Sequence, residues 1–205
     1  MAGLQMKVLG VSGAMAQGSD TLQILQEALV GAKDAGAEVQ LLDLSTVDPP
    51  NLRVGDKAQR ASAPVQRILT TAAWADAYII ATPEYHGGPS GALKNWFDHL
   101  YPEPAGKVAG IIATAGGNSA VQSSEQLETY LRMLHCWTLP YLAQAVRGDF
   151  DPEGHLTNDR VIDRLRRVGR DVATYGKLIR DQHTADVARG EGVEAGYAAW
   201  HRPKA

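Results

Sequence analysis

The 205-residue sequence contains a single cysteine, Cys136, and no apolar run that approaches a membrane span in length. One thiol excludes a disulfide framework within the chain and any paired-cysteine redox or zinc motif. A bilayer-spanning helix needs about 20 consecutive apolar residues. The first residues also lack the basic start and apolar stretch of a secretory signal. We therefore expect a soluble cytoplasmic protein with no membrane partner, in which Cys136 is a small buried side chain.

A strong charge of either sign is also absent. The sequence has 20 Lys and Arg against 23 Asp and Glu, a formal net charge of −3 at pH 7. The basic residues are scattered, except for a short cluster at 164, 166, 167 and 170 on a predicted helix. This balance does not indicate a nucleic-acid partner. The six histidines show no ligand spacing, so we predict no metal site.

Short β-rich runs alternate with stretches of helical period along the chain. The predicted strands are Lys7–Val11, Glu38–Leu44, Ala77–Thr82, Val108–Thr114 and Leu142–Val146. Helices are predicted between them, and a last helix from about Asp159 to Asp181. Such alternation predicts a single α/β domain with a three-layer, doubly wound parallel sheet. Ligands of these sheets bind at the carboxyl ends of the strands, which directs attention to the loops that follow them.

The loop after the first predicted strand is glycine-rich and leads into a helix. It reads GVSGAMAQGSDT over residues 10–21, with Ser19 or Asp20 as a suitable helix N-cap. Glycines at 13 and 18 expose backbone N–H groups beside a helix N-terminus, an arrangement that suits a phosphate. The loop lacks the lysine of a nucleoside triphosphate loop, and its glycines are wrongly spaced for the GxGxxG dinucleotide motif. On this loop alone, an ordinary tight turn remains an equal alternative.

A second motif follows the third predicted strand and reads PEYHGGPSGALKNWFD over residues 83–98. With the first loop, it resembles the NAD(P)H-dependent FMN reductase family of flavodoxin-like proteins, whose motifs run approximately GSxRxxSxN and PEYNxxxPGxLKNxxD. The resemblance covers about Met6 to Asp181. It implies five parallel strands in the order 2-1-3-4-5, noncovalent FMN, hydride transfer from NADH or NADPH, and a homodimer or homotetramer with the flavin near an interface.

The resemblance assigns a phosphate site to the first loop. Its expected members are Ser12, Ala14, Gln17, Gly18, Ser19 and Thr21. Ser19 and Thr21 match the family's serine and asparagine, whereas Ala14 and Ala16 replace its serine and arginine. Loss of one charge-assisted hydrogen bond costs about 1.5–3 kcal/mol, so we expect FMN to be held more weakly than is typical, unless Ser12 or a basic residue compensates.

The resemblance places the flavin ring against the next two loops. The expected ring-binding residues are Pro83, Glu84, Tyr85, His86, Gly87, Thr114, Gly116 and Gly117. Tyr85 would cover the dimethylbenzene side, and His86 stands where the family has asparagine, which makes pH-dependent binding possible. Backbone N–H groups of Gly116 and Gly117 would stabilise negative charge on the reduced ring. No catalytic side chain is predicted, because the cofactor carries the chemistry.

These residues predict an FMN-dependent NAD(P)H oxidoreductase that passes electrons to a flavin, a quinone or a similar small acceptor. Two alternatives stay open. One is a flavodoxin-type electron carrier, which the near-neutral charge disfavours because carriers dock through acidic faces. The other is a flavin-free regulatory or binding module, which Ala14 and Ala16 would permit.

Two apolar groups and the C-terminal segment complete the expectations. An apolar cluster of core or subunit-interface type is expected from Met133, Leu134, Trp137 and Leu139. The same interface is expected to be extended by Trp96, Phe97, Leu100 and Tyr101. Residues 1–181 are expected to form the flavin-binding domain. Residues 182–205 are expected to form a tail that docks on its own or a neighbouring subunit, with Tyr197 or Trp200 near the flavin entrance.

Overall fold

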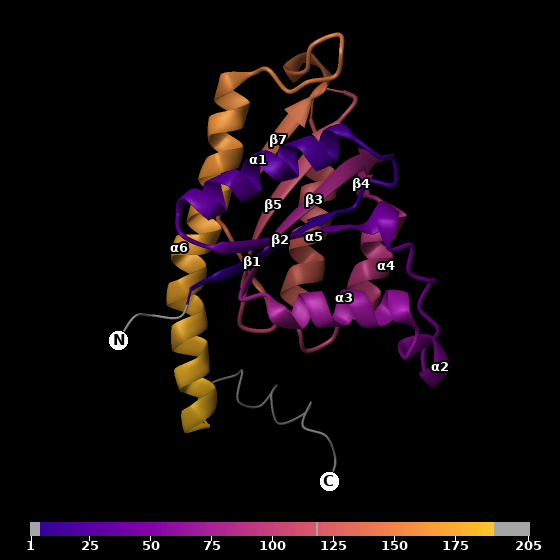
Figure 1. Cartoon of the computed structure of the whole chain (residues 1–205), viewed down its shortest axis with the longest axis vertical. Helices are drawn as coiled ribbons and strands as arrows, with labels where there is room; N and C mark the ends of the chain where they lie inside the picture. The colour runs from indigo at the N-terminus through magenta and orange to yellow at the C-terminus, as the bar shows by residue number, and fades with distance from the viewer. Residues whose placement is uncertain (1–4, 118, 191–205) are drawn as a thin grey trace.

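A computed structural model describes residues 5–117 and 119–190. Its principal strands are parallel and lie in the order β2-β1-β3-β5, followed by β6 and β7, both of which pair with β5 (Figure 1). The strands are β1 Lys7–Ser12, β2 Glu38–Asp43, β3 Ala77–Tyr85, β5 Val108–Ala115, β6 Trp137–Thr138 and β7 Ala143–Val146. The predicted 2-1-3-4-5 order is confirmed, with the fifth position shared by two short strands.

The fifth strand position is interrupted at Pro140, which lies between β6 and β7. Proline has no N–H to donate to a sheet ladder, so it is confined to edges, strand ends and irregular positions. A further short strand, β4 (Gly88–Pro89), returns antiparallel to the end of β3. The sheet therefore has one broken edge and one added hairpin, neither of which the alternating pattern predicted.

Helices cover both faces of the sheet, as the three-layer prediction requires (Figure 1). The helices are α1 Asp20–Asp34, α2 Lys57–Arg60, α3 Ala63–Trp74, α4 Gly91–His99, α5 Val121–Met133 and α6 Asp159–Arg189, with short 3-10 turns at Leu44–Thr46 and Arg147–Asp149. One core cluster joins the sheet to α3, α4 and α5, and the other joins it to α1 and α6. None of the helices in the described ranges has the length and apolar content needed to cross a membrane.

The last helix is longer than predicted. Instead of ending near Asp181, α6 continues to Arg189 and closes at Gly190, whose φ of 70° is a common helix-ending conformation. The added turns are polar, and Gln182 Nε2 donates to Asp186 Oδ1 over 2.7 Å. Such pairs four residues apart support a helix without apolar periodicity. Tyr197 and Trp200 lie outside the described residues, and the tail that contains them stays a prediction.

Large apolar residues of α4 belong to the core and not to an exposed interface, which corrects the sequence-based expectation. Trp96 and Phe97 are 0% and 4% exposed, and their rings meet edge to face with centroids 4.9 Å apart. Leu100 is buried as well, and only Tyr101 of this group is exposed. Trp96 and Phe97 belong to the same core cluster as buried residues of α3 and α5, so the apolar face of α4 packs against that core.

The predicted burial of Cys136 is confirmed. Its side chain is 7% exposed, and its Sγ donates to the Lys107 carbonyl oxygen at 3.2 Å. Burial raises the pKa of the thiol to about 12. Because the thiolate is the reactive form, this cysteine is chemically inert at neutral pH.

Candidate functional site

Three loops meet where β1, β3 and β5 end. Ser12 pairs in register with Ala81, and Pro83 pairs with Thr114, so the last residues of β1 and β5 flank the end of β3. Parallel strands present their carboxyl ends at the same sheet edge, where ligands of doubly wound folds bind. The sheet thus brings the three sequence-predicted loops to one edge.

The loop after β1 is locked to the start of α4. Ser90 Oγ donates to the Gly13 carbonyl oxygen over 2.6 Å and accepts the N–H of Leu93 over 3.1 Å, so it is also the N-cap of α4. A Cβ on Gly13 would lie 2.8 Å from Leu93 Cβ and 2.9 Å from Ser90 Oγ. Gly13 therefore allows the close approach of two segments. The sequence contained no signal for the bond between Ser90 and Gly13.

The same loop ends in the features of an anion site. Ser19 is the N-cap of α1 and accepts the N–H of Leu22 over 3.2 Å, and Gly18 has a φ of 64°. Gln17 and Gly18 are exposed. The N-terminus of a helix of this length carries about half a positive charge, which favours a bound phosphate.

Side chains near this helix terminus differ in whether they can donate a hydrogen bond to a ligand. Ala14 is buried and Ala16 is exposed, and neither offers a donor. Ser12 is 1% exposed, and among the described residues its Oγ has no hydrogen-bond partner. A buried hydroxyl left unpaired costs free energy, so the Ser12 hydroxyl is a candidate donor to a ligand at this loop.

A buried pair of hydroxyls connects the first and third loops. Thr21 Oγ1 and Thr114 Oγ1 are 2.7 Å apart and join residues 93 positions apart in the sequence. Both side chains are buried, at 1% and 7% exposure. The Thr21 hydroxyl therefore takes part in a contact within the fold, and the phosphate contact predicted for it stays a prediction.

The loop after β3 is a tight hairpin. Tyr85 pairs with Gly88 across it, which leaves His86 and Gly87 at the turn with φ values of 53° and 77°. A type I′ turn requires positive φ at both of its central residues. Asparagine and histidine enter this conformation more readily than most residues. The replacement of the family's asparagine by His86 therefore keeps the turn, and Tyr85 and His86 are both exposed beside the sheet edge.

Helix α5 holds this hairpin in place. Glu84 Oε2 accepts the N–H of Ser123 over 2.9 Å in the first turn of α5, where a carboxylate is favoured by the helix dipole. Gln126 Nε2 donates to the Gly87 carbonyl oxygen over 2.7 Å. The Glu84 side chain is thus a support for the loop, a role that sequence reasoning missed.

The third loop precedes α5 and leaves room on its outer side. Gly116 and Gly117 are exposed, and a Cβ on either would meet nothing within 4 Å. The end of this loop is fixed by Gln144 of β7, whose Oε1 accepts the N–H of Ala120 over 2.8 Å. Asn118 of this loop lies outside the described residues.

Asn95, in the LKN part of the second motif, fixes a more distant loop. Its Oδ1 accepts the N–H of Leu52 over 3.1 Å, and its Nδ2 donates to the carbonyl oxygen of Pro49 over 3.0 Å. Asn95 therefore has a structural role, and no sequence signal pointed to a loop more than 40 residues away. Lys94 and Asp98 form a surface ion pair at 2.5 Å.

Comparison with known proteins agrees with this geometry. Residues 6–151 match the sequence model of the family described as NADPH-dependent FMN reductase. The chain belongs to this family. An NAD(P)H-dependent FAD/FMN reductase from Geobacillus thermodenitrificans is 31% identical over 173 residues, which cover 82% of this chain and 91% of that protein. An NAD(P)H:quinone oxidoreductase from Solanum tuberosum is 29% identical, with 79% and 88% of the two chains covered.

Solved structures show the same fold. An NADH:FMN oxidoreductase in its apo form superposes with a TM-score of 0.70 at 22% identity and covers 83% of this chain and 90% of that chain. A flavodoxin from the domain Archaea has a TM-score of 0.62 at 14% identity, with 84% and 99% covered. The flavodoxin-like architecture predicted from the sequence is confirmed.

The residues at the sheet edge fit the FMN of this family. The unpaired Ser12 hydroxyl and the N-terminus of α1 suit a phosphate, and the open outer side of Gly116 and Gly117 suits the edge of a flat ring. The phosphate part has no arginine at position 16, where the family has its cation. The residues present therefore suit the predicted ring site and leave the predicted phosphate site without the cation of the family motif.

We expect the Thr21–Thr114 pair to contribute to stability as a unit. Replacing either threonine by valine leaves the other hydroxyl buried and unpaired, which costs about 1–3 kcal/mol. The double Thr21→Val/Thr114→Val variant removes both polar groups and should lose less than the sum of the single losses. Urea unfolding of the four proteins measures the coupling. Strictly additive losses would show that the two hydroxyls do not interact.

Proposed function

We propose that the chain is an FMN-dependent NAD(P)H oxidoreductase that passes electrons to a flavin, a quinone or a similar small acceptor. The observation that carries this proposal is the convergence of the three family loops at one sheet edge, fixed there by Ser90, Glu84 and the Thr21–Thr114 pair. The family match and the reductase relatives support it.

In this proposal the first loop holds the phosphate. Ser12 donates its free hydroxyl, Ser19 and the backbone of Gln17 and Gly18 line the helix terminus, and the dipole of α1 supplies positive potential. The Ala14 side chain is buried and contributes only backbone.

The hairpin and the third loop hold the ring. Pro83 to Gly87 offer backbone groups along one edge, and exposed Tyr85 covers an apolar side. Gly116 and Gly117 point N–H donors at the opposite edge, where they stabilise negative charge. FMN, when bound, accepts hydride from a reduced nicotinamide and passes electrons on; the chain's contribution is orientation and electrostatics.

The active assembly in this proposal is a cytoplasmic homodimer or homotetramer. Its support is apolar surface beyond the core: Met133, Trp137 and Tyr101 are 74%, 55% and 56% exposed. Contiguous apolar patches on a protein surface mark interaction sites, so the proposal requires that these side chains lie in the subunit contact. Light scattering on the purified chain measures the state directly, and a monomer at micromolar concentration would contradict it.

The decisive experiment adds FMN to the purified apoprotein, follows flavin fluorescence quenching, and then mixes the complex anaerobically with NADH or NADPH. We expect quenching followed by rapid bleaching of flavin absorbance with at least one nucleotide, since both loops of the ring site are in place. Quenching without bleaching would favour the electron carrier. An absence of quenching would favour a flavin-free module.

We expect Ala16→Arg to tighten FMN binding about tenfold or more, because one charge-assisted hydrogen bond to phosphate contributes about 1.5–3 kcal/mol. Met15→Arg is the matched control: Met15 is also exposed and adjacent, so it adds the same charge without occupying the family position. Fluorescence titration of both variants checks the difference. Equal gains in FMN affinity in the two variants would mean that only net charge matters. The absence of a gain in both variants would mean that the phosphate binds at another place.

A further inference from the structure

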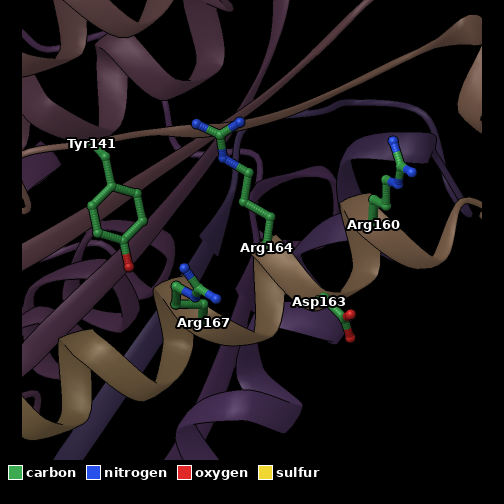
Figure 2. Close-up of a pocket in the computed structure, with 5 residues that line it drawn as sticks. All are labelled: Tyr141, Arg160, Asp163, Arg164 and Arg167. Carbon is green, nitrogen blue, oxygen red and sulfur yellow. The ribbon is translucent and has the colours of Figure 1, made fainter.

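A second cavity lies at the interruption of the fifth strand, away from the loops described above. It has a volume of about 470 Å³ and is lined by Tyr141, from the segment between β6 and β7, and by four residues of α6. Those residues are Arg160, Asp163, Arg164 and Arg167. Figure 2 shows Arg164 between Tyr141 and Arg160, with the Asp163 carboxylate pointing away from the Arg164 guanidinium group. We call this cavity the arginine pocket.

The arginines of α6 divide by their partners. Arg166 pairs with Glu27 of α1 at 2.8 Å, and Arg170 pairs with Asp171. Within the part of the chain that the structure describes, the guanidinium groups of Arg160, Arg164 and Arg167 form no ion pair. Because residues three and four apart share a helix face, these three line one stripe. Arginine stays protonated at all accessible pH values, so the stripe carries uncompensated positive charge.

The aromatic wall of the pocket adds no negative charge. Tyr141 donates its hydroxyl to Asp171 Oδ2 over 2.5 Å, and Asp171 is only 5% exposed. Burial and this hydrogen bond raise the pKa of Tyr141, which keeps the phenol neutral. Asp171 in turn is engaged by Tyr141 and Arg170. Of the residues that line the pocket, only Asp163 is acidic, so three positive charges face one negative charge.

We propose that the arginine pocket binds the phosphate groups of a nucleotide-sized anion. The planar fork of arginine matches phosphate oxygens in pairs, and Arg160 stands in the first turn of α6, where the helix dipole adds positive potential. The volume lies within the range of about 300–1,000 Å³ typical of small-molecule sites. The half-buried ring of Tyr141 supplies an apolar wall beside the charges. The anion is either part of the nicotinamide donor or a separate nucleotide.

The test is isothermal titration of the full chain with inorganic pyrophosphate in a phosphate-free buffer. We expect saturable binding that the Arg164→Gln/Arg167→Gln variant weakens about tenfold or more. Arg166→Gln is the control for charge loss on the same helix: it removes one positive charge, against two in the double variant, at a residue paired with Glu27, and its affinity should stay within about twofold of the parent. All positions are exposed, so folding should survive; thermal melts verify this.

Asp163→Asn gives a test of opposite sign. Removing the one carboxylate should tighten pyrophosphate binding about twofold or more, because a repulsive charge is lost. A merely structural role for the pocket would not produce tightening. The absence of saturable binding below about 10 mM, equal losses in the double variant and in Arg166→Gln, or weakening by Asp163→Asn would each overturn the proposal.

Competition separates the two sources of the anion. Displacement of pyrophosphate by NADPH identifies the donor's phosphates, whereas displacement by ADP but not by NADPH identifies a separate nucleotide. Either displacement supports the site. The titration needs no FMN, so its failure is distinguishable from a failure of the proposed reductase activity.

Discussion

The buried contact between Gly13 and Ser90 sets the geometry on which the candidate flavin site depends. The first loop can reach the start of α4 only because Gly13 has no side chain, and the Ser90 hydroxyl both bonds the Gly13 carbonyl and caps α4. A single serine therefore joins the phosphate loop to the helix that follows the ring-binding hairpin. Moving either segment would break a buried hydrogen bond and expose an uncapped helix end.

The other two connections extend this constraint to the third loop. The threonine pair joins α1 to the end of β5, and Glu84 joins the hairpin to α5. Each connection is made by groups that do not need to touch a ligand. These side-chain contacts fix the loops, and the exposed backbone groups of the loops remain available to a ligand. Pre-positioned backbone donors of this kind stabilise charge without reorganising when it develops.

The positive charges of this chain differ in position from those of the family's phosphate-loop motif. Position 16 lacks the cation of the family's phosphate loop, and Ala16 is exposed there. Three arginines that form no ion pair within residues 5–117 and 119–190 instead line a cavity on α6, whose arginines at 166 and 170 pair with neighbouring carboxylates. The FMN affinity proposed for the first loop and the anion affinity proposed for the arginine pocket are thus separate properties. They depend on different helices and are open to separate mutation.

Local patterns in the sequence were enough to predict the alternating strands and helices, the first glycine-rich loop and the burial of Cys136, because alternation, glycine spacing and helix caps are short-range features. The strand order and the assignment of the other two loops came from the resemblance of two motifs to a family. The same patterns placed the end of α6 too early, since its last turns are supported by polar pairs and not by an apolar period. They also assigned α4's aromatic residues to an interface, because periodicity shows that a face is buried but not what covers it.

What only the tertiary structure decided is which side chains meet. The Thr21 hydroxyl pairs with that of Thr114, 93 residues away, a contact that no local pattern indicated. Asn95 and Ser90 bond loops that precede them by more than 40 and 70 residues. Such partners depend on the register and crossing of whole elements, and no local spacing records them. The sequence by itself determined the type of sheet and the edge at which its loops meet. Packing between distant segments determined which polar groups form hydrogen bonds within the fold and which, like the Ser12 hydroxyl, have no partner among the described residues.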